Sequence, residues 1–255
     1  MTAFLASYRN EWYKLAVRKK YWVFLCVGAG ICMLWTGVGL YITKLSMQRF
    51  GGFPMKLNLM PTPMVVLPIF LQVLIPFLMF MGATDLLTVE GSENTIRAVL
   101  CRPVERWKLY ASKILAVVTY AAVYLACVYA VSAALNLLFG RGLAPMDYFR
   151  AFVSYALTLA PLAVLACFAA LVALLGRSGT LTMLLLLLLY MALKTIPAFF
   201  PVTTEMLFTS YLSWYRFWIG IVPGVSKSLQ ILATLLGYGV AFFTAGSLLF
   251  DRKEY

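Results

Sequence analysis

Long apolar runs alternate with short polar segments along the chain. A helix that crosses a bilayer needs about 20 apolar residues, and six of the runs reach that length. The expected spans are about 21–42, 63–84, 114–139, 151–175, 180–201 and 228–250. The pattern therefore predicts an all-α polytopic membrane protein, with residues 1–255 forming a single transmembrane domain.

The segment before the first run, residues 2–20, predicts a basic amphipathic helix. Its apolar positions recur every three or four residues and include Tyr8, Trp12 and Leu15. A helix of this kind beside a span should lie in the membrane interface. We expect the first span to be retained, because it is long and lacks the small-x-small exit of a cleaved signal peptide.

Prolines distinguish the second span. Pro61 and Pro63 stand at its start, and Pro68 and Pro76 lie inside it. Because an interior proline removes a helical hydrogen bond, this span should be kinked. Gln72 lies between the two interior prolines. It is a candidate for lining a transport path or for bonding a neighbouring helix.

The fifth span and the segment after it carry the other unusual residues. Lys194 lies near the end of the span, and it either lines a path or extends its ammonium group to the nearby interface. Segment 202–227 contains an aromatic stretch, 208–218. We expect short helices there, either as an interfacial aromatic belt or in contact with an amphiphilic substrate.

Composition agrees with a membrane protein and excludes several kinds of site. The chain is 63% hydrophobic and 12% charged, whereas soluble domains are about half apolar and a quarter charged. It has no histidine, which removes histidine-metal sites and histidine-based catalysis. Its five cysteines form no CxxC pair, so they read as small buried apolar residues. We expect no metal site and no catalytic residue.

The net charge of +12 reflects topology rather than nucleic-acid binding, because no soluble basic domain is present to carry it. Cytoplasmic loops collect lysine and arginine. With the N-terminus inside, 13 basic residues fall in inside segments and 7 in outside segments. We therefore expect a multi-pass protein of a bacterial plasma membrane, with both termini cytoplasmic.

Residues 85–113 form the only sizeable cytoplasmic loop of this topology. Asp85, Glu90 and Glu93 come first, followed by a short helix with an apolar patch that a proline ends. The element either docks in a groove of a soluble partner or is a solvated loop whose basic residues only set topology. We expect the acidic residues to contact basic groups, on a partner or on the N-terminal helix, and not to catalyse.

The loop resembles the hallmark segment of type-2 permeases of ATP-binding-cassette (ABC) exporters. The residues that match are Glu90, Glu93, Thr95, Ile96, Arg97, Leu100, Pro103, Arg106 and Lys113, and Asn94 stands where glycine is usual. The resemblance extends to the architecture, with six spans, an amphipathic helix before them and short helices between the fifth and the sixth.

This resemblance implies a function. Residues about 90–101 would be a coupling helix that docks on an ATP-binding subunit, and the N-terminal helix would lie against the same subunit. Two such ATP-binding cassette subunits would carry ATP and Mg²⁺, so that this chain needs no cofactor of its own and is not an enzyme. A second permease copy or a paralogue would complete the path, which the second and fifth spans line. The cargo would be amphiphilic: a peptide antibiotic, a lipid or a drug.

Three other functions remain open. An ion-coupled transporter would need acidic residues inside a span, and we expect none, because Asp85 falls at the end of one. An intramembrane enzyme would need an acidic pair at mid-span or a histidine. A membrane anchor for a soluble complex would need no path.

Overall fold

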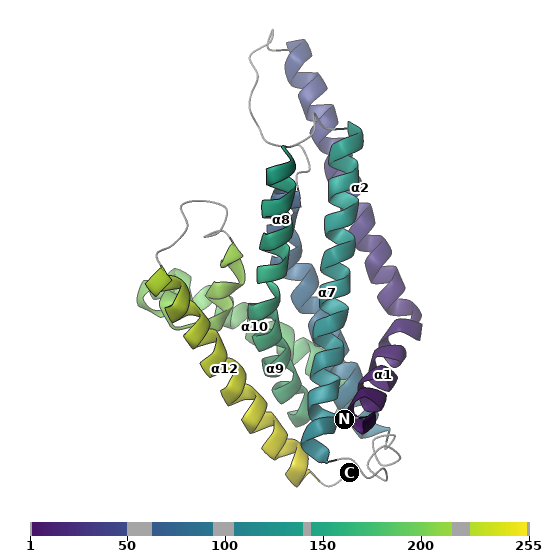
Figure 1. The fold of residues 1–255 in the computed structure, drawn as a ribbon, viewed down its shortest axis with the longest axis vertical. Coiled ribbons are helices and arrows are strands. Elements are labelled where there is room, and N and C mark those ends of the chain that lie inside the picture. Colours follow the sequence, from purple (N-terminus) through teal and green to yellow (C-terminus); the bar gives the residue numbers. More distant parts are fainter. Residues whose placement is uncertain (1, 50–62, 94–104, 140–143, 216–224, 254–255) are drawn as a thin grey trace.

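The structure is a computed structural model that describes residues 2–49, 63–93, 105–139, 144–215 and 225–253 (Figure 1). The α-helices are α1 (Thr2–Val17), α2 (Lys19–Arg49), α3 (Pro63–Ile69), α4 (Ile75–Ala83), α5 (Glu90–Ser92), α7 (Arg106–Phe139), α8 (Pro145–Leu157), α9 (Leu159–Leu175), α10 (Gly179–Phe199) and α12 (Val225–Arg252). These ranges contain no strand. Six helical stretches among them are long and apolar enough to cross a membrane, which confirms the prediction of an all-α polytopic membrane protein.

The six stretches coincide with the six predicted spans, and all but the fifth are longer than predicted. They are Lys19–Ile42, Pro63–Ser92, Arg106–Phe139, Pro145–Leu175, Gly179–Phe199 and Ser228–Arg252. The predicted loop at 85–113 is therefore wrong over 85–92 and 106–113, which are helical. The charged residues there were taken to end the spans, but most of them find partners inside the helix bundle.

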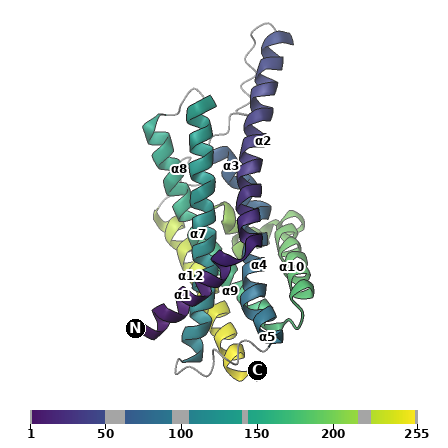
Figure 2. The same cartoon turned by 90° about the vertical axis from the view of Figure 1, so that its right-hand side faces the viewer.

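The two ends of the bundle differ. The short helix α1 crosses one end obliquely, and α12 also finishes there; we call this the terminal end (Figure 2). At the opposite end α2 and α7 rise well beyond the last turn of α10 (Figures 1 and 2). At 1.5 Å per residue, α10 is about 31 Å long and α7 about 51 Å, so only α10 matches the roughly 30 Å hydrocarbon core.

The prolines of the second span coincide with a change of helix type. Two π-helical turns interrupt this span, η1 (Phe70–Leu74) and η2 (Thr84–Val89). Turn η1 lies between Pro68 and Pro76, the two interior prolines for which the sequence predicts a kink. Pro76 has no N–H to donate to the carbonyl of Gln72, four residues earlier. The hydroxyl of Tyr190 on α10 donates to that carbonyl instead, at 3.2 Å.

The fourth span is interrupted at Thr158, where α8 ends and α9 begins. Pro161 is the cause, because it cannot donate to the carbonyl of Leu157. The part that precedes the break, α8, buries Ala151 and Tyr155 and leaves Phe149 exposed. The part that follows it, α9, buries 11 of its 17 residues and forms the centre of the bundle.

The segment between the fifth and sixth spans contains two short 3₁₀ helices, η3 (Pro201–Glu205) and η4 (Phe208–Ser213), as expected. The first aromatic residue of η4, Phe208, is buried in the protein rather than exposed at its surface. Phe208 packs against Phe168 and Phe242, with ring centroids 5.3 and 5.5 Å away. Trp214 and Tyr215 are also buried, so this segment packs into the core. The rest of the predicted stretch, 216–218, lies outside the described residues.

Candidate functional site

Four charged side chains meet inside the terminal end of the bundle. They are Glu11, Lys14, Glu90 and Lys113, and we call them the charge cluster. Lys113 Nζ lies 2.6 Å from Glu90 Oε2 and 3.1 Å from Glu11 Oε2. Lys14 Nζ lies 2.8 Å from Glu90 Oε1 and 3.1 Å from Glu11 Oε1. Each carboxylate therefore contacts both ammonium groups, and the four charges cancel.

The cluster joins three elements, because its members come from α1, from the end of the second span and from the start of α7. The side chains of Glu11 and Lys113 are 0% and 1% exposed. Burial lowers the pKa of Lys14, but the carboxylates of Glu11 and Glu90 outweigh that effect, and the pKa is raised. Removing one partner of a buried ion pair costs about 3–5 kcal/mol, because the other charge is left uncompensated.

A second ion group lies beside the cluster, on η2. The carboxylate of Asp85 pairs with Arg18 at 3.1 Å and also with Lys20. The Tyr21 hydroxyl donates to the same carboxylate oxygen, at 2.8 Å. Asp85 is thus buried and neutralised rather than solvated, and it holds the start of α2 against the second span. Among the residues that the structure describes, no three His, Cys, Asp or Glu side chains gather as a metal site would need.

Two of the residues expected to bind an ATP-binding subunit, Glu90 and Arg106, have partners within the chain. Glu90 is 4% exposed, and Lys14 and Lys113 occupy its carboxylate, so it is not on a docking surface. Its contact with Lys14 is the expected contact with the N-terminal helix. Glu93 is exposed. Arg106 is exposed as well, and its guanidinium donates to the carbonyl of Asp251 at 2.7 Å. The remaining five residues lie outside the described part of the chain: Thr95, Ile96, Arg97, Leu100 and Pro103.

The apolar face of α1 packs against the protein. Leu15 is fully buried, and Tyr8 and Trp12 lie against the buried core. The ring of Trp12 lies 6.2 Å from that of Tyr120 on α7. This face is therefore covered by α7, and the placement of the helix in the membrane interface stays a prediction. The sequence shows that the helix has an apolar face but not which partner covers that face.

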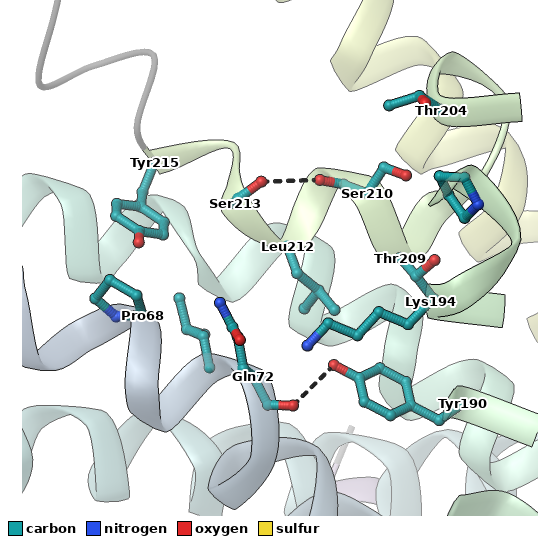
Figure 3. A pocket seen from close by; sticks show the side chains of 12 residues that line it. Pro68, Gln72, Tyr190, Lys194, Thr204, Thr209, Ser210, Leu212, Ser213 and Tyr215 are labelled. Carbon is teal, nitrogen blue, oxygen red and sulfur yellow. Dashed lines mark hydrogen bonds between the residues drawn. The ribbon is translucent and has the colours of Figure 1, made fainter. Parts of the chain in front are cut away.

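A cavity of about 290 Å³ lies between the second span, the end of α10 and η4 (Figure 3). We call it the Lys194 pocket. Both residues predicted to line a path, Gln72 and Lys194, line it together with Tyr190. Lys194 Nζ lies 5.7 Å from the Tyr190 ring centroid. The contact that Gln72 makes with a neighbouring helix is through its backbone carbonyl, whereas its side chain faces the pocket.

A family model described as "Protein of unknown function (DUF2705)" matches residues 43–255. The chain belongs to this family. The matched range includes Glu90 and Lys113 of the charge cluster and both polar residues of the pocket. Helix α1, with Glu11 and Lys14, precedes it. No curated protein matches the chain.

Sequence reasoning missed Glu11 and Lys14 as members of a site. The available signal was that Glu11 is the only acidic residue in a segment with five basic ones. An acid on the apolar side of a basic amphipathic helix indicates a buried cation nearby. The cation itself is Lys113, which is 102 positions away in the sequence. No local pattern relates two positions so far apart.

Proposed function

We propose that this chain is the membrane permease subunit of an ABC exporter, and that separate ATP-binding subunits drive it. The observation that carries the proposal is the charge cluster. It binds α1 to Glu90, the first residue of the segment at about 90–101 that resembles the coupling helix, and to the start of α7, which follows that segment. A force applied to that segment would reach the two spans and α1 together, since breaking their connection exposes uncompensated buried charges.

The arrangement at the terminal end supports the proposal. Glu93 is the last described residue before that segment, and it is exposed. Arg106 lies shortly after the segment and is also exposed. The exposed Glu93 side chain can contact a soluble partner on this side, whereas Arg106 would first have to exchange its contact with Asp251. Both termini are cytoplasmic in this proposal, which agrees with the excess of basic residues on the same side.

The partners follow from the same proposal. Two ATP-binding subunits with ATP and Mg²⁺ would dock at the terminal end, and a second permease copy or a paralogue would complete the path in a bacterial plasma membrane. The cargo is amphiphilic, such as a peptide antibiotic, a lipid or a drug. The Lys194 pocket supports the presence of a path, because polar groups at such depth are costly unless they serve a partner.

The test is a pull-down of the tagged full chain from its native host in several mild detergents, followed by assays of ATP binding and hydrolysis on the recovered partner. The matched variants are Glu93→Lys and Glu205→Lys. Both replace an exposed acid by a base, but Glu205 lies on η3, at a distance from the terminal end.

We expect an ATP-hydrolysing subunit with the wild type and with Glu205→Lys, and its loss with Glu93→Lys. If no ATP-binding protein is recovered with the wild type in any detergent, the proposal is refuted. Equal recovery with both variants would remove the docking role of Glu93.

One observation favours a second candidate, an ion-coupled transporter. Asp85 and Glu90 are buried within the helix of the second span, contrary to the expectation that no acid lies inside a span. Buried carboxylates of this kind serve as proton carriers in transporters. Proteoliposomes with a pH-sensitive dye inside test it, because proton uptake that Asp85→Asn abolishes would support this function. Both carboxylates are paired with cations here, so we favour the permease.

A further inference from the structure

The Lys194 pocket carries a single formal charge, and it is positive. Lys194 is the only charged residue among the twelve that line it. Within the described ranges its ammonium group has no acidic partner, since no ion pair involves it and its one close contact is the Tyr190 ring. Lys194 is exposed on the surface of the single chain, so the bilayer rather than the protein fold would deprive it of water. An ammonium group without a counter-ion is unfavourable at that depth, and a bound anion would remove the cost.

The direction of the Lys194 side chain argues against a role as a simple interface anchor. Helix α10 starts at the terminal end, so its last residue, Phe199, lies nearest the opposite membrane surface. A lysine that only reached for water would extend past Phe199. Lys194 instead extends back over Tyr190, one turn deeper, and its ammonium group lies inside the pocket (Figure 3).

Hydrogen-bonding groups line the same cavity as the ammonium group: the carboxamide of Gln72 and the hydroxyls of Thr209, Ser210 and Ser213 (Figure 3). The hydroxyls of Thr209 and Ser213 already donate to the backbone carbonyls of Leu193 and Ser210. The Gln72 carboxamide and the Ser210 hydroxyl make no such bond among the described residues. Amides and hydroxyls donate to phosphate or carboxylate oxygens, and such charge-assisted bonds are about twice as strong as neutral ones. The pocket thus offers one cation and two neutral donors, which suits an anion of low charge.

The size and surroundings of the pocket limit what the anion belongs to. Sites for whole small molecules span about 300–1,000 Å³, and this cavity of about 290 Å³ is at the small end. It has room for a headgroup but not for an acyl chain as well. Helix α10 leaves Leu184 and Leu188 57% and 61% exposed, about three and two turns nearer the terminal end than Lys194. A hydrocarbon tail attached to the headgroup would lie against these leucines within the bilayer.

The opposite end of the bundle, like the terminal end, carries a net positive charge. The segments that join the spans at the opposite end, together with Lys194, contain eight basic and two acidic residues. Clustered charges of one sign raise the local concentration of ions of the other sign.

We propose that the Lys194 pocket binds the singly charged headgroup of an anionic amphiphile, with a phosphate or carboxylate on Lys194 and the tail against α10. The binding itself does not depend on the proposed permease function. Only the further step, that such an amphiphile is the transported cargo, rests on it.

The test measures binding to the purified full chain in neutral detergent by titration calorimetry. The probes are short-chain phosphatidylglycerol, short-chain phosphatidylcholine with the same tails, and glycerophosphoglycerol, which offers the same singly charged phosphodiester without tails. The variants are Lys194→Gln, Lys194→Arg and Lys44→Gln. Lys44 is exposed near the end of α2 and lines no part of the pocket, so its variant controls for the loss of one charge at the same end. The unfolding temperature of each variant confirms that it is folded.

We expect Lys194→Gln to weaken phosphatidylglycerol binding about tenfold or more, as the loss of a charge-assisted hydrogen bond implies. Lys194→Arg and Lys44→Gln should stay within about threefold of the wild type, and phosphatidylcholine should bind about tenfold less tightly. Equal binding by the wild type and Lys194→Gln, or equal affinity for both lipids, would overturn the proposal. Competition by glycerophosphoglycerol at equal concentration would show a site for free anions and overturn the proposal that the ligand is an amphiphile. If lipid binding is found but no ATP-binding subunit is recovered, only the permease proposal fails.

Discussion

Replacing Lys113 by methionine tests whether the charge cluster holds the terminal end together. Methionine keeps the length of the side chain but removes the cation from two buried carboxylates, 2.6 and 3.1 Å away. Lys14, which is 28% exposed, remains as the only counter-ion for both. We expect a loss of about 3–5 kcal/mol of stability, as for other buried ion pairs that lose one member.

The assay is thermal unfolding of the purified chain in mild detergent. At about 2–4 °C per kcal/mol for a chain of this size, the unfolding temperature should fall by about 6–20 °C. The control is Lys108→Met, five residues earlier on the same helix. Lys108 pairs with Glu105 at 2.8 Å, but both side chains are exposed, so its loss should cost only about 0–1 kcal/mol.

A second substitution separates the loss of charge balance from the loss of packing. Adding Glu11→Gln to Lys113→Met leaves one carboxylate and one ammonium group, which restores neutrality. We expect it to recover about 1–3 kcal/mol, the usual size of coupling between contacting residues. The reasoning is refuted if Lys113→Met costs no more than Lys108→Met, or if the second substitution adds to the loss instead of reducing it.

Three further predictions concern single contacts, each measured by thermal unfolding. Tyr190→Phe should cost about 1–3 kcal/mol, because the proline-freed carbonyl of Gln72 loses its donor; an unchanged midpoint would mean that another group satisfies it. Gly246→Ala should cost about 1–3 kcal/mol, because its Cβ would overlap a buried tyrosine of α7, whereas Gly237→Ala on the same helix meets open space and should not destabilise. The raised pKa of Lys14 implies stability that is complete below pH 10.5 and lost as pH rises through the folded-state pKa; a flat profile there would contradict it.

The number and type of spans could be predicted because apolar length is a local property of the sequence. The ends of the spans could not. Asp85 and Glu90 read as the start of a loop, since a charge usually marks the edge of a span. Lys14, Arg18 and Lys113 neutralise them, and the helix continues to Ser92. Pairings between distant positions decide such boundaries, and hydrophobic pattern alone does not contain them.

The candidate pocket was predicted in part. Gln72 and Lys194 stood out separately, because polar residues inside spans are rare and usually functional. Their common cavity depends on the packing of the second span against α10 and on η4, which covers it. The sequence does not determine the direction of the Lys194 side chain either, because a lysine near a helix end can instead extend its ammonium group to the membrane interface.

The second span is the element that connects the two candidate sites. Its far end, Glu90, belongs to the charge cluster, and Gln72 belongs to the pocket. Between them, α4 buries eight of its nine residues, so it moves as a packed unit rather than bending along its length. The π-helical turns η1 and η2 lie at its two ends, and η1 contains Gln72 while η2 contains Asp85. Irregular turns of this kind are where a helix most easily changes its geometry. In the proposed permease, a displacement of the cluster would therefore reach the pocket through α4, with the changes in backbone geometry concentrated at η1 and η2.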